Sequence, residues 1–367
     1  MDNINLKTLA RLANVSTTTV SLCLRNDKRI SPKTKKRVLK MTERFKYRPS
    51  AVGRAMVSGR TKTIGLIVSN IDFYYQGLMA KGIFESLAEE NYCLLLYNTK
   101  QIPEKENECM HRCVERRVEG IIIAPIQPSL SEETFQELRQ KRIPFVLIDR
   151  KVDGLVADYV GTDDFKGVKK AVKYLVALGH RRIAHISGPL YFYNSKQRRA
   201  GYLEALSEAG IKPDNKFIAE AVYENAELTK KKVFGLLAQR PLPTAILCDT
   251  DIQAAAAILA VAESGLSVPR DISVVGFCDM DLAHCLNPTL TTIRQPGFEV
   301  GKEAARILLR RIKKGAAGIR KTSNLKPTEV ELPTKLIIRG STSPIAHNQI
   351  DLEKYEKLQV FAPGCHA

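Results

Sequence analysis

"NLKTLARLANVSTTTVSLCL", residues 5–24, contains two short amphipathic segments with a few polar residues between them. Asn5 can cap a first helix, and Asn14 can adopt the left-handed backbone conformation that ends one. Ser16 can cap a second helix. Helical spacing predicts that the residues facing inward are Leu6, Leu9, Ala10, Ala13, Val20, Cys23 and Leu24.

A third helix is predicted within "SPKTKKRVLKMTERF", residues 31–45, where Ser31 can cap and Pro32 takes the first helical position. About three residues separate the first two helices, which is typical of a helix-turn-helix unit. The second helix of such a unit enters the major groove of DNA. The polar residues at its start are expected to contact base edges (Thr17, Thr18) and phosphates (Thr19, Ser21). The alternative is that the threonines only cap and solvate the start of the helix.

Positive charge is concentrated at the N-terminal end of the chain. Residues 1–62 hold 16 lysines and arginines against three acids, so they carry +13 of the formal net charge of +18. The remaining 305 residues are nearly balanced, at +5. A small helical module with such an excess is an electrostatic footprint for nucleic-acid phosphates.

From Thr63 onward, apolar runs alternate with helical stretches. Continuous apolar strands separated by helices indicate parallel sheets covered on both faces. Seven such strands favour two sheets, and therefore two α/β subdomains with a ligand site between them, at the carboxyl ends of the strands. The predicted strands are residues 63–68, 93–98, 120–125, 144–149, 182–187, 244–249 and 272–277.

Other classes of protein are disfavoured by what the chain lacks. Its longest apolar runs, such as residues 120–126, are far below the roughly 20 residues that span a bilayer. We recognise no signal peptide and expect a cytoplasmic protein. In "CMHRC", residues 109–113, only the two cysteines would share a helix face, so we expect reduced thiols and no metal. We find no common nucleotide-binding or hydrolase motif, read His180 and His185 as structural, and expect neither an enzyme nor a cofactor.

Taken together, the sequence resembles bacterial transcription regulators of the LacI/GalR family over residues 3–342. In the N-terminal module the resemblance rests on "LARLANVSTTTVS", "RISPKTKKRVL" and "YRPSAVGRAMVSGRTKTIG". In the rest of the chain it rests on "RVEGIIIAP", "LIDR", "LGHRRIAHISGP", "QRRAGYLEALSEAGI", "PRDISVVGF", "LTTIRQP" and "LIIRGST". Single fragments are weak, but their order along the chain is highly specific.

The resemblance implies an all-α helix-turn-helix headpiece, residues 1–49, that binds double-stranded DNA as half of a homodimer on a near-palindromic operator. Residues 50–62 would form a hinge helix (50–57) and a linker. Two departures are notable: Leu22 stands where the family usually has an arginine, and Met56 replaces the family's hinge leucine. The residues expected to contact DNA are Asn5, Ser16, Thr17, Thr18, Thr19, Ser21, Arg25, Asn26, Arg29, Tyr47, Ser50 and Met56.

The resemblance further implies that residues 63–342 form an α/β periplasmic-binding-protein-like core of two parallel-sheet subdomains. One would comprise residues 63–160 with 293–324, and the other residues 161–292 with 325–342. Residues 343–367 would be a tail of unknown role. A small, carbohydrate-like effector would bind between the subdomains, contacting Tyr75, Asp149, Ser195, Arg198, Tyr223 and Asp279.

Cys278 stands where the family often has an aspartate that holds sugar hydroxyls, which weakens the expectation of an ordinary sugar. A DNA-binding regulator controlled by a protein partner, or without an effector, is therefore the alternative. A sugar receptor that never contacts DNA is a further hypothesis, but the basic N-terminal module disfavours it.

Overall fold

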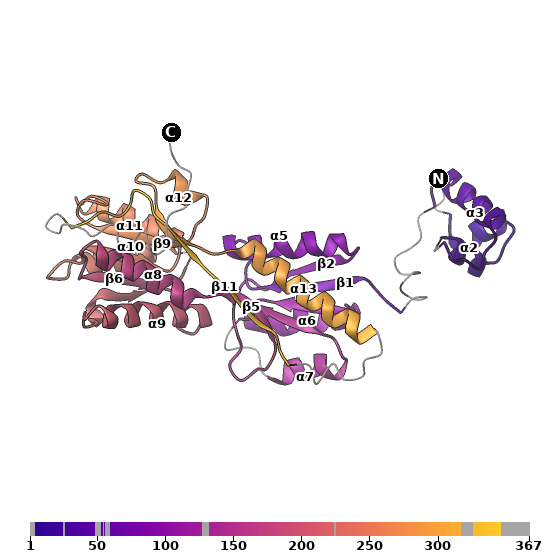
Figure 1. Cartoon of the computed structure of the whole chain (residues 1–367), viewed down its shortest axis with the longest axis horizontal. Coiled ribbons are helices and arrows are strands. Elements are labelled where there is room, and N and C mark those ends of the chain that lie inside the picture. Colours follow the sequence, from indigo (N-terminus) through magenta and orange to yellow (C-terminus); the bar gives the residue numbers. More distant parts are fainter. Residues whose placement is uncertain are drawn as a thin grey trace. The chain divides into compact units, whose positions relative to one another are not determined.

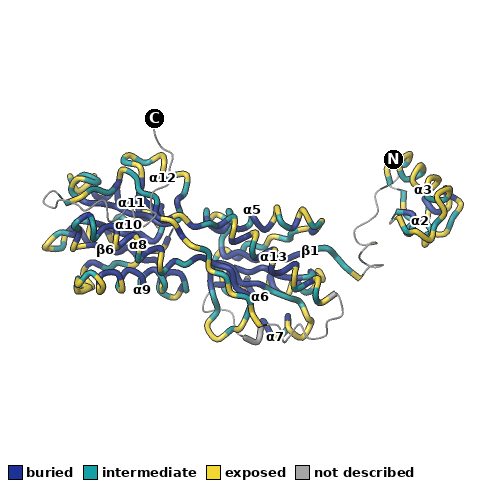
Figure 2. Tube along the Cα trace, in the orientation of Figure 1, coloured by how far each residue is buried: buried dark blue, intermediate teal, exposed yellow. Residues whose placement is uncertain are grey.

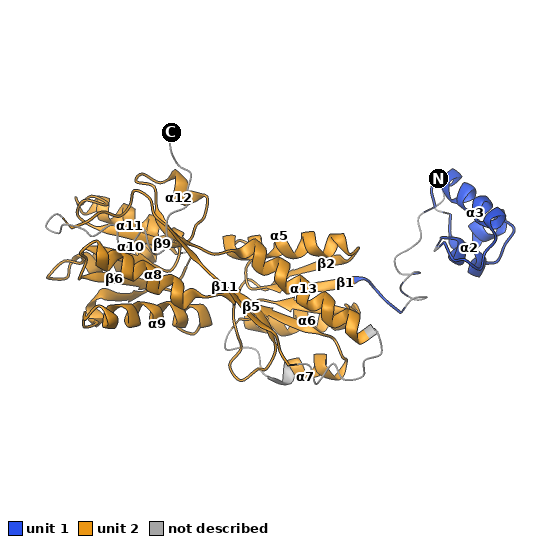
Figure 3. Cartoon of the chain, in the orientation of Figure 1, with its two compact units in different colours: residues 1–62 blue, residues 63–367 orange. Residues whose placement is uncertain are grey.

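The computed structural model describes residues 4–24, 26–47, 53, 55, 59–126, 132–223, 225–316 and 326–345. The chain divides into two units, residues 1–62 and residues 63–367 (Figure 3).

Within described residues 4–47, the N-terminal unit has the helices α1 (Leu6–Leu12), α2 (Thr17–Leu24) and α3 (Pro32–Arg44). The predicted caps are confirmed, because Asn5 accepts a hydrogen bond from the Thr8 backbone N–H at 2.9 Å and Ser31 accepts one from Thr34 at 3.3 Å. Asn14 adopts a left-handed φ of 49° after α1, as predicted. The buried core of the unit consists of Leu9, Ala10, Ala13, Val20, Cys23 and Val38. Apart from Gly53 and Ala55, which are helical, the predicted hinge helix lies outside the described residues.

The first sheet of the second unit has the strand order β11-β5-β4-β3-β1-β2, and all its described pairings are parallel (Figure 1). Its strands are β1 (Thr63–Val68), β2 (Cys93–Asn98), β3 (Gly120–Ile123), β4 (Phe145–Ile148), β5 (Asp158–Thr162) and β11 (Glu329–Leu332). Helices α5 (Tyr74–Glu89) and α13 (Gly297–Ala316) cover one face, and α6 (Pro103–Glu115) and α7 (Glu132–Gln140) cover the other. Two apolar cores result, one on each side of the sheet.

The second sheet has the order β12-β10-β9-β8-β6-β7, in which only the described β10–β12 pairing is antiparallel. Its strands are β6 (Ile183–Ser187), β7 (Ile218–Glu220), β8 (Ala245–Cys248), β9 (Ser273–Cys278), β10 (Thr291–Arg294) and β12 (Lys335–Ile337). Helices α8 (Asp164–Ala177) and α9 (Tyr193–Glu208) cover one face, and α10 (Ala226–Leu237) and α11 (Asp251–Glu263) the other. Two short helical segments, η1 (Asn215–Phe217) and α12 (Leu282–Cys285), complete the subdomain. Figure 2 shows the inner strands of both sheets as buried, whereas β2, β7 and β11 at the sheet edges are half-buried or exposed.

All seven predicted strands occur, and five more join them. The described chain crosses between the sheets three times: between β5 and α8, between β10 and α13, and between β11 and β12. These segments are the hinge between the two subdomains.

The predicted limits of the subdomains need correction. Residues 329–332 were expected in the second subdomain, but β11 pairs with β5 of the first sheet, placing Glu329 opposite Tyr159. β5 and β10 each extend two residues beyond the predicted limits, to Thr162 and Arg294. Residues 343–345 were expected in the tail, yet the backbone of Ile345 donates to Leu178 of the second subdomain at 3.0 Å. The rest of the predicted tail lies outside the described residues.

Candidate DNA-binding surface and effector site

The polar side chains at the start of α2 fall into two sets: those that cap the helix and those that do not. Ser16 Oγ accepts a hydrogen bond from the Thr19 backbone N–H at 3.0 Å and lies 2.8 Å from the Thr19 hydroxyl, so these two residues cap the helix. Within the described residues, the hydroxyls of Thr17, Thr18 and Ser21 form no side-chain hydrogen bond, and Thr18 is exposed. The hydroxyls of Thr17, Thr18 and Ser21 therefore take no part in capping α2.

The remaining predicted DNA contacts also have local roles. Asn26 accepts from Lys35 Nζ at 3.0 Å, and both oxygens of Asp27 accept from the guanidinium of Arg29 at 2.8 to 3.0 Å. These bonds from Arg29 lower the pKa of Asp27 below its usual value. Tyr47 packs against the core of the N-terminal unit. Three predicted contacts, Arg25, Ser50 and Met56, lie outside the described residues.

Between the subdomains of the second unit lies a group of buried polar side chains at the carboxyl ends of the strands, which is where ligands bind in open α/β sheets. Residues of both subdomains contact each other in this group. We call it the inter-subdomain cluster and define it as Tyr75, Asp149, Arg150, Asp164, Ser195, Arg198, Tyr223, Asp249 and Gln295, each at most 8% exposed.

Among the cluster residues of the second subdomain, Arg198 contacts both Asp164 and Asp249. Its Nε donates to the carboxylate of Asp164 at 2.9 Å, and its Nη1 donates to the backbone carbonyl of Asp249 at 2.6 Å. The guanidinium also covers the ring of Phe277 at 3.8 Å. Burial acts to lower the pKa of Arg198, but Asp164 and its other acidic neighbours raise it above the usual value. Arg198 is therefore a fixed cation.

Ser195 and Tyr223 lie together, since their hydroxyls share a short hydrogen bond. The ring of Tyr223 is stacked on that of Phe192, with an interplanar angle of 13° and a centroid distance of 6.0 Å. Burial raises the pKa of Tyr223 above its usual value, so its hydroxyl stays protonated. These rings provide a flat apolar wall beside polar hydroxyls.

Asp149 is the acceptor that the first subdomain contributes. It is approached by Gln76 Nε2 at 3.4 Å, Arg150 Nε at 3.5 Å and, from the second subdomain, Asn194 Nδ2 at 3.5 Å. All three distances exceed the ~2.7–2.9 Å of a good charge-assisted hydrogen bond. Tyr75 is buried nearby, and its pKa is raised well above the usual value by burial and by Asp149. Asp149 therefore retains capacity to accept from a ligand.

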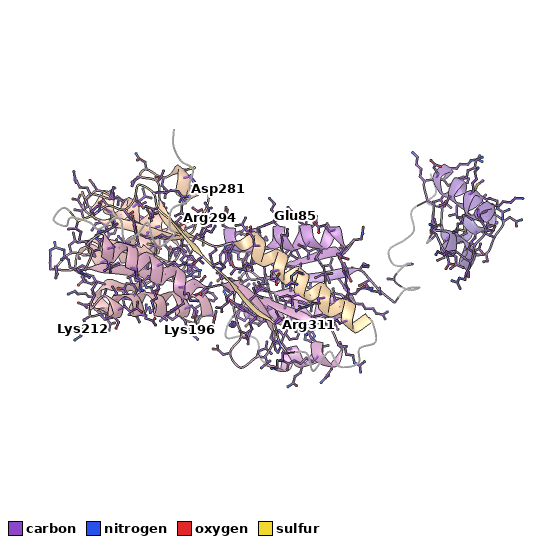
Figure 4. All side chains as sticks on the ribbon, in the orientation of Figure 1. Glu85, Lys196, Lys212, Asp281, Arg294 and Arg311 are labelled. Atoms are coloured by element: carbon purple, nitrogen blue, oxygen red, sulfur yellow. The ribbon has the colours of Figure 1, made fainter. Side chains whose placement is uncertain are left out.

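Asp279 has other hydrogen-bond partners than the remaining five predicted effector contacts. Its carboxylate is held by Arg294 Nε and by Arg339 Nη2 at 2.7 Å. It lines a cavity of about 450 Å³ beside the hinge, together with Tyr74 and Leu78 of the first subdomain and Lys335 of the second. Figure 4 labels Asp281 and Arg294, which line the same cavity. Cys278 and Gln295 also line it, and Cys278 is a thiol whose pKa burial raises well above the usual value.

Several cluster residues were absent from the sequence prediction: Arg150, Asp164, Asp249 and Gln295. Arg150 lies 4.0 Å above the ring of Phe192, which belongs to the other subdomain. Gln295, on a hinge segment, donates to Thr162 at 2.9 Å. Their position in the sequence could have identified them, because each follows a strand closely. Polar residues that follow a strand in this way lie at the ligand-binding edge of the sheet.

A helix-turn-helix unit followed by a two-subdomain α/β core of parallel sheets is the architecture of a class of DNA-binding transcription regulators. Residues 5–50 match the description "Bacterial regulatory proteins, lacI family", and residues 172–342 match "Periplasmic binding protein-like domain". The transcriptional regulator DegA of Bacillus subtilis (strain 168) is 34% identical over 338 residues, which cover 92% of this chain and 97% of DegA. The transcriptional repressor PurR of Aliivibrio salmonicida (strain LFI1238) is 34% identical over 309 residues, covering 84% of this chain and 92% of PurR.

The similar solved structures are also of transcription regulators. The lac repressor dimer bound to operator and the anti-inducer ONPF has a TM-score of 0.82 and 25% identity, covering 93% of this chain and all of that chain. The complex of the transcriptional regulator CelR with cellobiose has a TM-score of 0.67 and 26% identity, covering 92% of this chain and 99% of that chain.

The chain belongs to the LacI family of bacterial regulatory proteins. It is a DNA-binding transcriptional regulator, and its relatives are regulators rather than enzymes. The histidines that were read as structural are both buried: His180 lies 3.0 Å from the Thr244 hydroxyl, and His185 lies 2.9 Å from Asp249. Among the described helices, none combines the length and the apolar character that a bilayer crossing requires.

Proposed function

We propose that this protein is a repressor that binds a near-palindromic operator as a homodimer, and that a small carbohydrate-like effector at the inter-subdomain cluster controls this binding. The observation that carries the proposal is the cluster itself, because both subdomains contribute buried polar groups to it and Asp149 is held only at long distances. An effector hydroxyl can donate to Asp149 while the stacked rings of Tyr223 and Phe192 contact its apolar face.

The proposed effector contacts are Tyr75, Asp149, Ser195, Arg198 and Tyr223. Asp279 would join them only for an effector that extends into the hinge cavity. A ligand that prefers one relative arrangement of the subdomains shifts the population toward it, by as much as its affinities for the arrangements differ. The lac repressor structure with an anti-inducer and the CelR structure with cellobiose support a small ligand.

The homodimer is supported by the lac repressor dimer on its operator and by apolar side chains left exposed on the core. Phe84 of α5 is 59% exposed and Leu259 of α11 is 57% exposed. Burial of large apolar side chains such as these is a main source of free energy for association. Two headpieces brought together by a twofold axis would read an operator with matching symmetry.

The test is selection of bound sites from random duplex DNA with the full chain, followed by binding measurements at rising salt. We expect a near-palindromic consensus whose affinity falls steeply with salt, because phosphate contacts release counterions. A screen of sugars and nucleosides for release of that DNA then identifies the effector, and Asp149→Ala should abolish the response. Weak, uniform binding without a consensus would contradict the operator proposal.

The alternative is a DNA-binding regulator that a protein partner controls, or that has no effector. The observation in its favour is Cys278, which offers no carboxylate to sugar hydroxyls. If a consensus is found but no sugar or nucleoside releases the DNA or shifts the melting temperature of the core, this alternative replaces the effector proposal.

A further inference from the structure

One face of α2 carries an apolar side chain that has no role in the headpiece core. Val20 and Cys23 of this helix are buried, and Leu24 packs against them. Leu22 is partly exposed and belongs neither to that core nor to the apolar residues packed against it. Folding of the headpiece therefore does not account for a leucine at this position.

Leu22 shares its helix face with Thr18, whose hydroxyl forms no side-chain hydrogen bond among the described residues. Residues four apart on a helix are neighbours, so Leu22 lies one turn beyond the exposed Thr18. The face thus presents the Leu22 methyl groups beside the methyl and hydroxyl of Thr18. The unit around it is strongly basic, and lysines and arginines suit phosphates.

A leucine can neither bind a phosphate nor donate to a base. In the major groove a leucine side chain can make apolar contact with the C5-methyl group of thymine. This methyl group distinguishes A·T pairs from G·C pairs. An arginine at the same position would instead pair with the O6 and N7 acceptors of guanine.

Resting on the proposed operator binding, we propose that Leu22, together with the Thr18 methyl, is a specificity-determining residue that reads a thymine methyl group in each half-site. The half-site then contains an A·T pair facing Leu22, with the thymine methyl in apolar contact. The contribution is independent of salt, because no counterion is released.

The experiment uses the full chain and the consensus selected from random DNA. Each thymine of one half-site is replaced in turn by uracil, which removes the methyl group and keeps the base pairing. At one position we expect wild-type binding to weaken by about threefold to fivefold, the value of one buried methyl group. Leu22→Ala should show a clearly smaller penalty for uracil, because only the Thr18 methyl then contacts the thymine, with an unchanged slope of affinity against salt.

Leu39→Ala is the matched control, because Leu39 is 49% exposed on α3 and also lies outside the headpiece core. This variant should show the full wild-type penalty for uracil. Leu22→Arg should shift a new selection toward guanine at the same position. A consensus in which no uracil penalty depends on residue 22 would overturn this inference alone, whereas selection without any consensus would overturn the proposed operator binding as well.

Discussion

Arg198 and Asp164 form a buried ion pair across two helices of the second subdomain, with Arg198 Nε and Nη2 both 2.9 Å from the same carboxylate oxygen. Their side chains are 3% and 5% exposed. Asp164 also accepts from the Thr162 hydroxyl at 2.6 Å and from Gln295 at 3.2 Å. The pair therefore links α8, α9 and a hinge segment.

Arg198→Met should destabilise the core strongly as well as disturb the proposed effector site. It leaves the Asp164 carboxylate buried without its charged partner, which costs about 3–5 kcal/mol. The double variant Arg198→Met/Asp164→Asn should recover much of that loss, because the buried charge is then gone. Urea unfolding followed by tyrosine fluorescence measures both, since all but one of the twelve tyrosines lie beyond residue 62.

Arg294→Met is the matched control, because Arg294 is 50% exposed and its partner Asp279 keeps Arg339. It should cost less than about 1 kcal/mol. Equal losses for Arg198→Met and Arg294→Met would contradict a special role of the buried pair.

Ser16→Ala and Thr18→Ala should separate helix capping from DNA reading. Ser16 caps α2 through the Thr19 backbone N–H, so its loss should destabilise the headpiece by about 1 kcal/mol and weaken binding to all DNA. Thr18→Ala should leave stability unchanged and reduce the preference for operator over random DNA. Circular dichroism melting and competition binding measure the two effects. An unchanged preference in Thr18→Ala would remove Thr18 from the residues that read bases.

The sequence predicts the strands that are long and apolar and misses the short polar ones. β1, "TIGLIV", and β2, "CLLLYN", coincide with the predicted runs. β10, "TTIR", and β11, "EVEL", show no continuous apolar run, and β11 forms at the edge of the first sheet, beside β5. Pairing partners distant in sequence define such strands, so local pattern alone does not reveal them.

The residues of the candidate site also fall into those that the sequence identifies and those that it does not. Thr18 and Arg198 are found from motifs, because their neighbours in sequence identify them. Arg150 gains its role from contacts that are distant in sequence, such as Phe192, which belongs to the other subdomain, and the Pro125 carbonyl. Asp279 is grouped with Arg198 among the expected effector contacts, but the sequence gives no sign of its two arginine partners at the hinge cavity. Contacts of this kind depend on how the two subdomains pack.

Gly82→Ala should be destabilising, whereas Gly77→Ala in the same helix should not. A Cβ atom at Gly82 would collide with the backbone carbonyl of Phe298, because α5 and α13 pack closely there. We expect a loss of about 1–3 kcal/mol from the enforced separation of the helices. At Gly77 a Cβ atom would meet nothing nearer than the Ile71 carbonyl at 3.8 Å. Alanine there should gain up to about 1 kcal/mol, because it favours the helix.

Both glycine variants are measured by urea unfolding of the full chain, followed by tyrosine fluorescence. The comparison is internal, since both positions lie in α5 and both receive the same methyl group. A Gly82→Ala protein as stable as Gly77→Ala would show that α13 can shift without loss, and would contradict the close packing of the two helices.

Asp251, at the start of α11, should make the stability of the core depend on pH near neutrality. Its carboxylate accepts from the Met280 backbone N–H at 2.7 Å and from the Thr292 hydroxyl. Burial raises the pKa of Asp251 to about 7. The unfolded carboxyl titrates near pH ~4, so the folded core binds the proton more tightly. Stability contributed by this group is therefore present at low pH and falls as the pH rises through the window from about 4 to 7.

Asp251→Asn isolates this effect, because other titrating groups such as His180 are common to both proteins. From pH 6 to pH 8 the wild type should lose about 1 kcal/mol relative to the variant, which cannot ionise there. Urea unfolding at the two pH values measures the difference. Burial of the carboxylate, opposed by the Met280 and Thr292 hydrogen bonds and by Arg339, sets the size of the loss. A difference between the proteins that is the same at both pH values would mean that Asp251 does not titrate between pH 6 and pH 8 in the folded core, and would contradict its raised pKa.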